Sequence, residues 1–396
     1  MLGEVRGKSY RTFSSNDVLF AKITPCMENG KSAVVPEIQS RIGFGSTEFH
    51  VIRPRAGVNP RYIWHYVRQE RFRSAARRSM TGSVGQARVP AAFLENALIP
   101  LPDIAEQARI VRLLDEADGK SHSASSHLSA AARAIERFRD GVLVAACTGR
   151  LTSQWREVNS CTSVEEALSK IPGHSGRRTK QENGSGLALP DFPDTFVVST
   201  VGRAAVRLDY GTSKRADATV ADGIPVLRMG NIQNGCLDFA DLKYCATDHE
   251  IGTLLLRDGD LLFNRTNSPE LVGKSAVFHA DEEMTFASYL IRARFAEEVA
   301  ESDFVNYWIN SAWGRAWARQ VKTDGVSQSN INGTKLAAMP LPLPPIEEQR
   351  EIVRVVRQIL QIADALLVQA DTANRKIGSA FSAVLAKALP GDLVHS

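Results

Sequence analysis

Two copies of a Gly-Lys-Ser sequence, Gly30–Ser32 and Gly273–Ser275, are the residues of this chain that most resemble a chemical site. A phosphate-binding loop needs another glycine five residues before the first of these residues, a strand before the loop and a helix after it. Pro25 and Ser268 occupy that glycine position, and a strand-like Ala-Val follows each copy. We therefore do not expect nucleoside triphosphates to bind at either copy.

Other patterns of catalytic or metal-binding residues are weak. Asp241-Leu242-Lys243 has the spacing of some nuclease sites, but no second acidic residue can be assigned to it. The chain also lacks a glycine-rich dinucleotide fingerprint and the Asn/Asp-Pro-Pro-aromatic motif of amino-methyltransferases. His249 and His279 are expected in loops or on the surface rather than as metal ligands. We therefore predict a non-catalytic chain with no cofactor or metal of its own.

Polar side chains suited to DNA are concentrated in turn-rich segments. Arginine pairs with guanine, asparagine and glutamine pair with adenine, and lysine suits phosphates. The candidate DNA-binding residues in the second half of the chain are Lys214, Arg228, Asn231, Arg265, Asn267, Lys274, Gln328 and Asn330. Those in the first half are Lys22, Lys31 and Gln86, which match Arg265, Lys274 and Gln328 in the repeat described below.

Composition is compatible with this interpretation. The chain has 396 residues, of which 43% are hydrophobic and 23% charged, so we expect two or three folded domains rather than disorder. The net charge of +4 permits a nucleic-acid partner without requiring one. No apolar run reaches the ~20 residues of a membrane-spanning helix. The N-terminal sequence has no secretion signal. The five cysteines are scattered and form no CxxC pair, which argues against a disulfide framework or a zinc site, so a cytoplasmic protein is expected.

The chain is a duplication. Asp17–Phe20 matches Asp260–Phe263, and Gly30–Val34 matches Gly273–Val277, both at an offset of 243 residues. Pro100–Val111 repeats as Pro342–Val353 at an offset of 242. One spacing held over more than a hundred residues indicates two copies of a large unit rather than a short-period solenoid.

The front half of each copy is predicted to mix strands and helices. Helices are expected at Pro60–Ser79 and Ser302–Val321, each with an aromatic face that packs into a core. Short strands are expected at Asp17–Ala21, Ala33–Val35, Glu48–Ile52, Ile224–Met229, Asp260–Asn264, Ala276–Phe278 and Tyr289–Phe295.

The back half of each copy is predicted to be one long helix. Apolar residues step by four and three from Ile352 to Val384, and their counterparts run from Ile110 to Val142, which is typical of a coiled coil. The alternative is a single amphipathic helix lying on each domain. A seam of this length covers ~48 Å, so we expect the two helices to pair antiparallel as a spacer between two domains related by a pseudo-twofold axis.

The predicted fold class is α+β, with two β-rich domains separated by two long antiparallel coiled-coil helices. A polar stretch from Ile171 to Gly186 is expected to be a flexible loop. The predicted boundaries are 1–98 for the first domain, 99–150 for the central helix, 151–195 for a linker, 196–340 for the second domain and 341–396 for the distal helix.

Several repeated segments resemble the specificity subunits of type I restriction-modification systems. The similar segments are PLPxIxEQxxIV at Pro100–Val111 and Pro342–Val353, the two Asp-hydrophobic-Leu-Phe strands, Gly149–Glu157, Leu189–Pro193, Tyr210–Ser213 and Val226–Ile232. The resemblance covers nearly the whole chain. It implies two target recognition domains that bind double-stranded DNA and no catalysis in this chain.

The resemblance also implies partners. Two methyltransferase (modification) subunits would bring S-adenosylmethionine, and restriction/translocase subunits would use ATP and Mg²⁺. Two readers on a ~48 Å spacer would recognise two different half-sites about 14 base pairs apart. A coiled-coil interaction scaffold without DNA function is the alternative, and a methyltransferase fused to a recognition domain is a weaker third possibility.

The two copies are unequal at their starts. The second begins near Phe196, and the matching position in the first would lie roughly 48 residues before Met1. We therefore expect a first recognition domain that is shortened at its N-terminus, either because the true start lies upstream or because the unit is genuinely shorter. The Tyr210–Ser213 loop and the Arg228 segment have no counterpart in the first copy.

Overall fold

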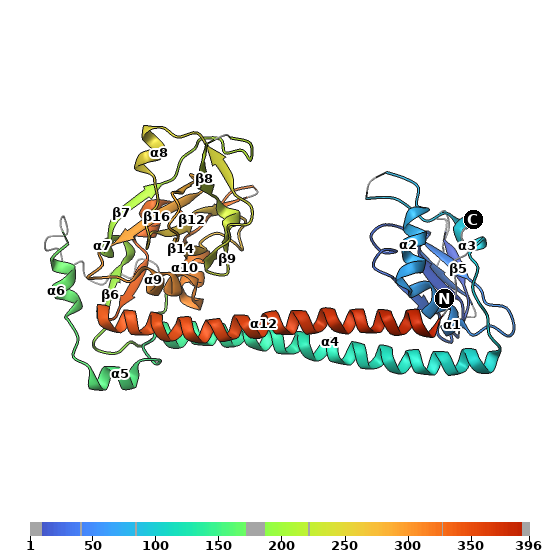
Figure 1. The fold of residues 1–396 in the computed structure, drawn as a ribbon. Coiled ribbons are helices and arrows are strands. Elements are labelled where there is room, and N and C mark those ends of the chain that lie inside the picture. Colours follow the sequence, from blue (N-terminus) through green and yellow to red (C-terminus); the bar gives the residue numbers. More distant parts are fainter. Residues whose placement is uncertain are drawn as a thin grey trace. The chain divides into compact units, whose positions relative to one another are not determined.

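Residues 10–39, 42–83, 85–171, 187–220, 222–326 and 328–389 are described by a computed structural model of the chain. The chain divides into two compact units (Figure 1). Unit 1 comprises Met1–Arg133 and Leu367–Ser396, and unit 2 comprises Ala134–Leu366. Both units combine helices with strands, which confirms the predicted α+β class.

Unit 1 is built on a three-stranded antiparallel sheet in the order β3-β2-β5. Its core is formed by apolar residues of the central strand and by the aromatic faces of two helices, including Phe20, Tyr62, Tyr66 and Phe72. The elements are β1 (Arg11–Phe13), β2 (Val18–Ala21), β3 (Ser32–Val34), β4 (Gly43–Gly45), β5 (Phe49–Ile52), α1 (Pro60–Arg68), α2 (Glu70–Arg78) and α3 (Ala91–Glu95).

Unit 2 contains a four-stranded antiparallel sheet in the order β14-β12-β16-β7, joined by smaller sheets. Its strands are β6 (Val197–Thr200), β7 (Ala205–Tyr210), β8 (Ile224–Leu227), β9 (Ile232–Gln233), β10 (Cys236–Leu237), β11 (Lys243–Cys245), β12 (Leu261–Asn264), β13 (Thr266–Asn267), β14 (Ser275–Val277), β15 (Thr285–Phe286), β16 (Leu290–Phe295), β17 (Thr323–Asp324), β18 (Ser329–Asn330) and β19 (Pro340–Leu343). Its shorter helices are α5 (Ser153–Val158), α6 (Val164–Ser169), α7 (Val201–Ala204), α8 (His249–Thr253), α9 (Ser302–Asn310), α10 (Ala312–Val321) and α11 (Gly333–Ala337), with a 3₁₀ turn, η1, at Met229–Asn231.

The sheet registers confirm the duplication. Val18 pairs with Val34 in unit 1, and Leu261 pairs with Val277 at the equivalent position in unit 2. The aspartate that begins each repeated strand is buried. Asp17 accepts from Arg53 (2.6 Å), and Asp260 accepts from Arg294 (2.7 Å). The Asp-hydrophobic-Leu-Phe sequence is therefore a strand start whose buried carboxylate is held by an arginine.

The predicted strands lie within one or two residues of the observed ones, but the two predicted helices are each broken in two. Pro60–Ser79 breaks at Gln69, and Ser302–Val321 breaks at Ser311, where the backbone is extended. Ser311 then caps the new helix by accepting from the N–H of Gly314. A Cβ at Gly314 would lie 2.2 Å from the carbonyl oxygen of Ile309, so the break brings the two helices too close for a larger residue.

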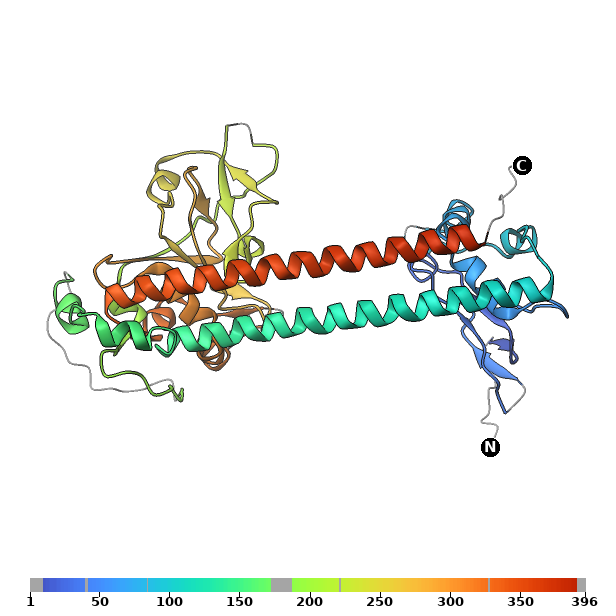
Figure 2. The same ribbon diagram turned by 60° about the horizontal axis from the view of Figure 1, so that its bottom comes forward.

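The long helices are α4 (Ile104–Cys147) and α12 (Ile346–Ala388), each continuous and shared between the two units (Figure 2). In unit 2 the end of α4, at Cys147, shares a core with the beginning of α12, at Ile352. In unit 1 the beginning of α4, at Leu114, shares a core with the end of α12, at Leu385. The helices are therefore antiparallel within each unit.

The predicted seam along these helices is partly wrong. Phe138, Leu366 and Val384 were assigned to it but are 55%, 46% and 36% exposed. An ideal straight helix drifts by ~20° per heptad relative to a strict seven-residue repeat, so a strict 4-3 step leaves the contact stripe. The drift leaves large apolar side chains on open helix faces.

The glutamine of the repeated Pro-Leu-Pro segments joins each domain to its long helix. The Gln349 side chain accepts from the N–H of Glu301 (2.9 Å) and donates to the carbonyl of Val299 (2.8 Å). Gln107 accepts from the N–H of Asn59 (2.8 Å) in the same way. Both glutamines are buried, so this motif is structural.

The predicted linker at 151–195 contains α5 and α6, and the polar stretch at 172–186 lies outside the described residues. No helix in the described ranges is both long and apolar enough to cross a lipid bilayer.

Candidate nucleic-acid interface

One edge of the four-stranded sheet in unit 2 gathers the predicted DNA-binding segments. β12 and β7 are both antiparallel to β16, so their carboxyl ends meet the beginning of β16. Three loops emerge at this edge, after Tyr210, after Asn264 and before Leu290. Segments that are far apart in the chain, from Tyr210 to Leu290, are therefore brought together by strand order.

Backbone hydrogen bonds hold these loops to one another. The N–H of Ser288 donates to Thr212 (2.8 Å), and the N–H of Ala287 donates to Leu227 (2.9 Å). The second bond places the Arg228 segment beside the same edge. The N–H of Ile331 donates to Arg265 (2.9 Å), which attaches the segment that follows β18. We call this surface the reading edge of unit 2.

Arg265 is a central feature of the reading edge. Its guanidinium lies 4.8 Å from the ring centroid of Tyr210 and donates to the carbonyl of Ser288 (3.1 Å). No carboxylate pairs with it among the residues that the structure describes. Its positive charge therefore remains uncompensated, while the aromatic ring restricts its orientation. Tyr289, 46% exposed at the same edge, was missed by the sequence analysis, although an exposed aromatic residue at a strand end is a usable signal.

A short hairpin carries two more predicted residues, Gln328 and Asn330. β17 and β18 pair through Thr323 and Asn330, and β18 also pairs with β13. The Asn330 amide donates to the Thr266 hydroxyl (2.8 Å), whereas Gln328 is exposed beyond the strand. The side chain of Asn267, in β13, accepts from the N–H of Ser268 (2.8 Å).

Two cations of the reading edge are already paired with acids. Lys214 forms an ion pair with Asp248, and this hydrogen bond raises the pKa of the lysine. Arg228 donates to the Asp241 carboxylate (2.9 Å). Contact of either cation with a phosphate would have to replace a carboxylate partner.

Asn231 and Lys274 do not lie on the exposed face, contrary to what a direct DNA contact requires. Asn231 is 3% exposed, accepting from the N–H of Arg228 (2.9 Å) and donating to Asp238 (2.8 Å). Lys274 is 7% exposed and donates to the carbonyl of Ile232 (2.8 Å), and burial lowers the pKa of its ammonium group. Both side chains hold loops in place, because neighbouring backbone groups take up their hydrogen bonds.

The described part of unit 1 has an equivalent edge. The N–H of Val89 donates to the carbonyl of Lys22 (2.9 Å), which repeats the bond between Ile331 and Arg265. Lys31 and Gln86 are exposed, so unit 1 presents both at the surface. Lys31 thus differs from its buried counterpart Lys274.

The Gly-Lys-Ser copies form strand entries rather than phosphate loops. Gly30 and Gly273 have φ of +69° and +90°, and each copy runs into a strand, β3 or β14. A Cβ at Gly273 would lie 2.8 Å from that of Ala318, so glycine is needed for close packing there.

His279 and α12 form an ion-pair network in unit 2 that the sequence analysis did not anticipate. His279 contacts Asp258 (2.7 Å) and Asp303 (3.0 Å), and Arg357 donates to Asp303 (2.6 Å). The hydrogen bond to Asp303 raises the pKa of His279 to about 9, so this imidazole is charged at neutral pH. His249 lies in α8. No group of three or more metal-ligating side chains occurs among the described residues.

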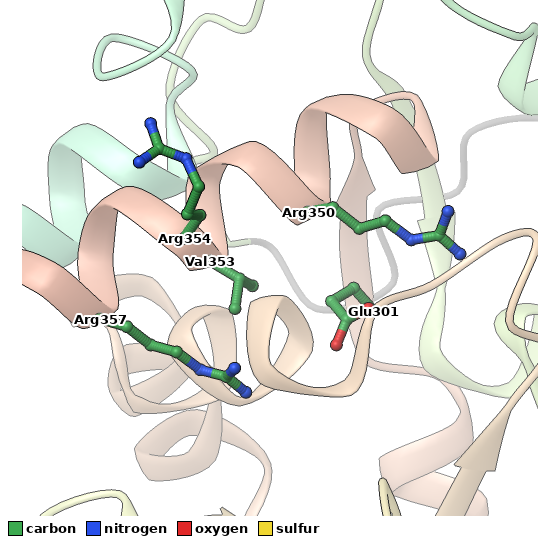
Figure 3. Close-up of a pocket in the computed structure, with 5 residues that line it drawn as sticks. All are labelled: Glu301, Arg350, Val353, Arg354 and Arg357. Atoms are coloured by element: carbon green, nitrogen blue, oxygen red, sulfur yellow. The ribbon is translucent and has the colours of Figure 1, made fainter.

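Three arginines of α12 line a shallow pocket of about 310 Å³ with Val353 and Glu301. Arg350 and Arg357 lie on either side of Glu301, whereas Arg354 points away from it (Figure 3). Arg354 pairs with Glu351 on its own helix (2.7 Å). This part of α12 therefore presents a basic surface.

The chain is similar to known proteins over most of its length. A family model described as the type I restriction modification DNA specificity domain matches residues 2–126 and 211–369. The specificity subunit of type I restriction enzyme EcoKI from Escherichia coli K12 is 27% identical, covering 98% of this chain and 76% of that protein. The StySPI specificity subunit of Salmonella potsdam is 26% identical over the same shares.

Solved structures share the fold. A chain from a structural study of complex assembly and conformational transition of the type I R-M system matches with a TM-score of 0.71 and 21% identity, over 99% of this chain and 86% of that one. The HsdS subunit from Thermoanaerobacter tengcongensis matches with a TM-score of 0.50 and 22% identity, over 99% and 85%.

Proposed function

Because this chain belongs to the family of type I restriction-modification DNA specificity proteins, we propose that it reads a bipartite, gapped DNA sequence with one half-site per unit. Non-catalytic DNA sequence recognition is the role of the family. The observation that supports two half-sites is the repetition of the reading edge, with the bond from Ile331 to Arg265 matched by that from Val89 to Lys22. Because the matched residues differ, the two half-sites should differ in sequence.

The gap is supported by the continuity of the long helices. α4 has 44 residues and α12 has 43, and each begins in one unit and ends in the other. A continuous helix is stiff and rises ~1.5 Å per residue, so it can hold two readers at a fixed spacing. Fixed spacing is what distinguishes a gapped site from two independent half-sites.

Each unit's reading edge would combine base contacts with phosphate contacts. Arg265, held against Tyr210, is suited to bidentate pairing with guanine, and the exposed Gln328 is suited to adenine. Lys22 and Gln86 would take the corresponding positions in unit 1, and Lys31, which is exposed there, would add a phosphate contact. Asn231 and Lys274 would support the loops without touching DNA.

The chain would also hold its catalytic partners. Ile362, Leu366 and Val368 are 64%, 46% and 65% exposed on α12, an unusual concentration of large apolar side chains on one helix segment. We propose that such open helix faces dock two methyltransferase subunits, which supply S-adenosylmethionine and the methylation chemistry. Restriction/translocase subunits, with ATP and Mg²⁺, would join through that complex.

The test is reconstituted methylation of a DNA library with randomised half-sites and gap lengths. With the neighbouring methyltransferase, the chain should direct methyl transfer to one gapped sequence. Methylation that does not depend on the chain, or that shows no sequence preference with it, would contradict the proposal.

Two variants serve as controls for each other. Arg265→Ala should relax the sequence preference at only the half-site read by unit 2, and Lys22→Ala at only the other half-site. The loss of binding free energy should be ~1–3 kcal/mol for a lost bidentate base contact and less for a lost phosphate contact.

A salt titration of duplex binding separates this function from a DNA-independent scaffold. Phosphate contacts make the logarithm of the affinity fall steeply with the logarithm of the salt concentration.

A further inference from the structure

Two arginines of α10 and the lysine that precedes β14 form a group of positive charges in unit 2. Arg315 and Arg319 are four residues apart, so their side chains leave the same face of α10. Burial and then the charge of Arg315 lower the pKa of Lys274, and burial and then the charge of Arg319 lower the pKa of Arg315. The three cations therefore lie close enough to repel one another, and we call them the α10 cation cluster.

No carboxylate compensates the α10 cation cluster within the described part of the chain. Lys274 donates to the carbonyl of Ile232 (2.8 Å), and Arg315 donates to the side-chain oxygen of Asn310 (3.1 Å). Both of these partners are neutral, and the ion pairs formed by described residues include none of the three cations. Arg315 is half-buried and Arg319 is exposed, so a ligand can reach the cluster from the surface of α10.

The equivalent arginines of unit 1 are both paired with acids. Arg73 and Arg77 on α2 correspond to the two arginines of α10 at the offset of 242 residues. Arg73 pairs with Glu70 (2.6 Å) on its own helix, and Arg77 pairs with Glu28 (3.2 Å) in the loop before β3. The same helix face is therefore neutralised in unit 1.

Apolar residues occupy both acid positions in unit 2. Glu70 corresponds to Ala312 at the offset of 242, and Glu28 corresponds to Leu271 at the offset of 243 that relates the two Gly-Lys-Ser copies. Both apolar residues are exposed, so neither is needed to fill a core. A group of like charges without internal compensation attracts counter-ions, and the α10 cation cluster therefore has the properties of an anion site.

The α10 cation cluster lies beside the reading edge. The N–H of Asn264 donates to the carbonyl of Lys274 (2.8 Å), and Asn264 directly precedes Arg265. On the other side, α10 ends at Val321, two residues before β17 of the hairpin that carries Gln328. DNA held at the reading edge would therefore bring its backbone next to α10.

We propose that Arg315 and Arg319 bind a phosphate of the DNA backbone beside the half-site read by unit 2, and that α2 of unit 1 makes no such contact. Guanidinium groups suit phosphate because they can donate two parallel hydrogen bonds to it. Lys274 adds positive charge from below without touching DNA. The inference rests on the proposed function and adds the residues that fix the position of the backbone at one of the two half-sites.

The experiment measures how salt affects DNA binding by the full chain with a saturating amount of its neighbouring methyltransferase. Two fluorescein-labelled duplexes of unrelated sequence serve as probes. Each phosphate contact contributes about 0.9 to the slope of log affinity on log salt, so Arg319→Ala should make the slope shallower by about that amount on both duplexes. For lines that meet at about 1 M salt, this corresponds to about eightfold weaker binding at about 0.1 M. Arg77→Ala, at the matched and already paired position, should change neither slope nor affinity.

A second pair of variants tests the charge without removing an arginine. Ala312→Glu places an acid three residues before Arg315, as Glu70 stands before Arg73 in unit 1. It should weaken DNA binding and make the salt slope shallower, whereas Ala312→Gln should do neither. An acid in the first turn of a helix favours the helix, so Ala312→Glu should not lower the unfolding temperature, and thermal unfolding checks this.

The outcomes separate this inference from the proposed function. If the unmodified complex shows a steep salt dependence that Arg319→Ala and Ala312→Glu leave unchanged, the phosphate contact is wrong and the proposed function stands. If the unmodified complex does not bind either duplex, both fail. If the variants bind DNA normally but need more methyltransferase to assemble, the cluster binds an acidic surface of that subunit instead, and the inference is overturned.

Discussion

Removal of the buried carboxylate of Glu348 should destabilise unit 2 far more than removal of its repeat counterpart, Glu106, destabilises unit 1. Glu348 is 0% exposed and accepts from Arg156 through Nε (3.0 Å) and from the Thr152 hydroxyl (2.6 Å). Among the described residues, the ion-pair partner of Glu106 is Arg109, three positions along the same helix, and the Glu106 side chain is 39% exposed. The two residues occupy the same position of the duplicated motif in different environments.

The magnitudes follow from this difference in burial. Glu348→Ala leaves the Arg156 guanidinium, 18% exposed, without its partner, and breaking a buried pair in this way costs ~3–5 kcal/mol. Glu106→Ala removes an exposed pair worth ~0–1 kcal/mol. At about 2–4 °C per kcal/mol for a body of 150–250 residues, Glu348→Ala should lower the unfolding temperature of unit 2 by roughly 6–20 °C.

Scanning calorimetry, which records the unfolding of both units, measures this difference, and tryptophan fluorescence identifies the transition that belongs to unit 2. Four of the five tryptophans, Trp155, Trp308, Trp313 and Trp317, belong to unit 2, so the signal reports mainly on that unit. Equal shifts for Glu348→Ala and Glu106→Ala would refute the reasoning, because they would show that burial of the carboxylate does not determine its contribution.

Two further outcomes concern unit 2. Because the pKa of His279 is raised to about 9 from 6.5, its stabilising ion pair with Asp303 is complete below pH about 6.5 and is lost as pH rises through about 9. In the His279→Gln variant, the free energy of unfolding in urea should no longer fall between pH 6.5 and about 9. If the variant keeps the pH profile of the unmodified chain, His279 is not the group responsible. Gly273→Ala should destabilise unit 2 by about 1–3 kcal/mol in urea unfolding, because glycine there has φ of +90°. Gly252→Ala in α8, where an added Cβ meets no other atom, should be neutral or stabilising by up to ~1 kcal/mol. Equal costs at the two glycines would contradict the explanation by backbone conformation at Gly273.

The duplication explains why much of the fold could be predicted from sequence. Each predicted strand of unit 1 had a matching segment in unit 2, so β2 and β12 were located from two sets of residues rather than one. The long helices followed from sustained apolar spacing, which depends on local residues alone. The two-residue strand β13 was missed because it exists through its pairing with β18, in which Thr266 lies opposite Asn330.

The candidate site was predictable in composition but not in detail. Arg265 and Gln328 were found from residue type and lie at the reading edge. Asn231 and Lys274 have equally suitable side chains, but both are buried and donate hydrogen bonds to backbone carbonyls. Residue type does not reveal which polar groups the backbone will use, since that depends on loops that meet only after folding.

One ion pair between domain and long helix has its charges reversed between the two units. In unit 1, Arg61 on α1 donates to Asp115 on α4 (2.6 Å), whereas in unit 2, Asp303 on α9 accepts from Arg357 on α12 (2.6 Å). These pairs contribute little stability where they are exposed. If α4 and α12 exchanged domains, however, Arg357 would face Arg61 and Asp115 would face Asp303, so like charges would meet in both units. A duplicated chain has two nearly equivalent ways to pair domains with helices. The reversed charges favour one of them, so each reading edge stays with its own helix.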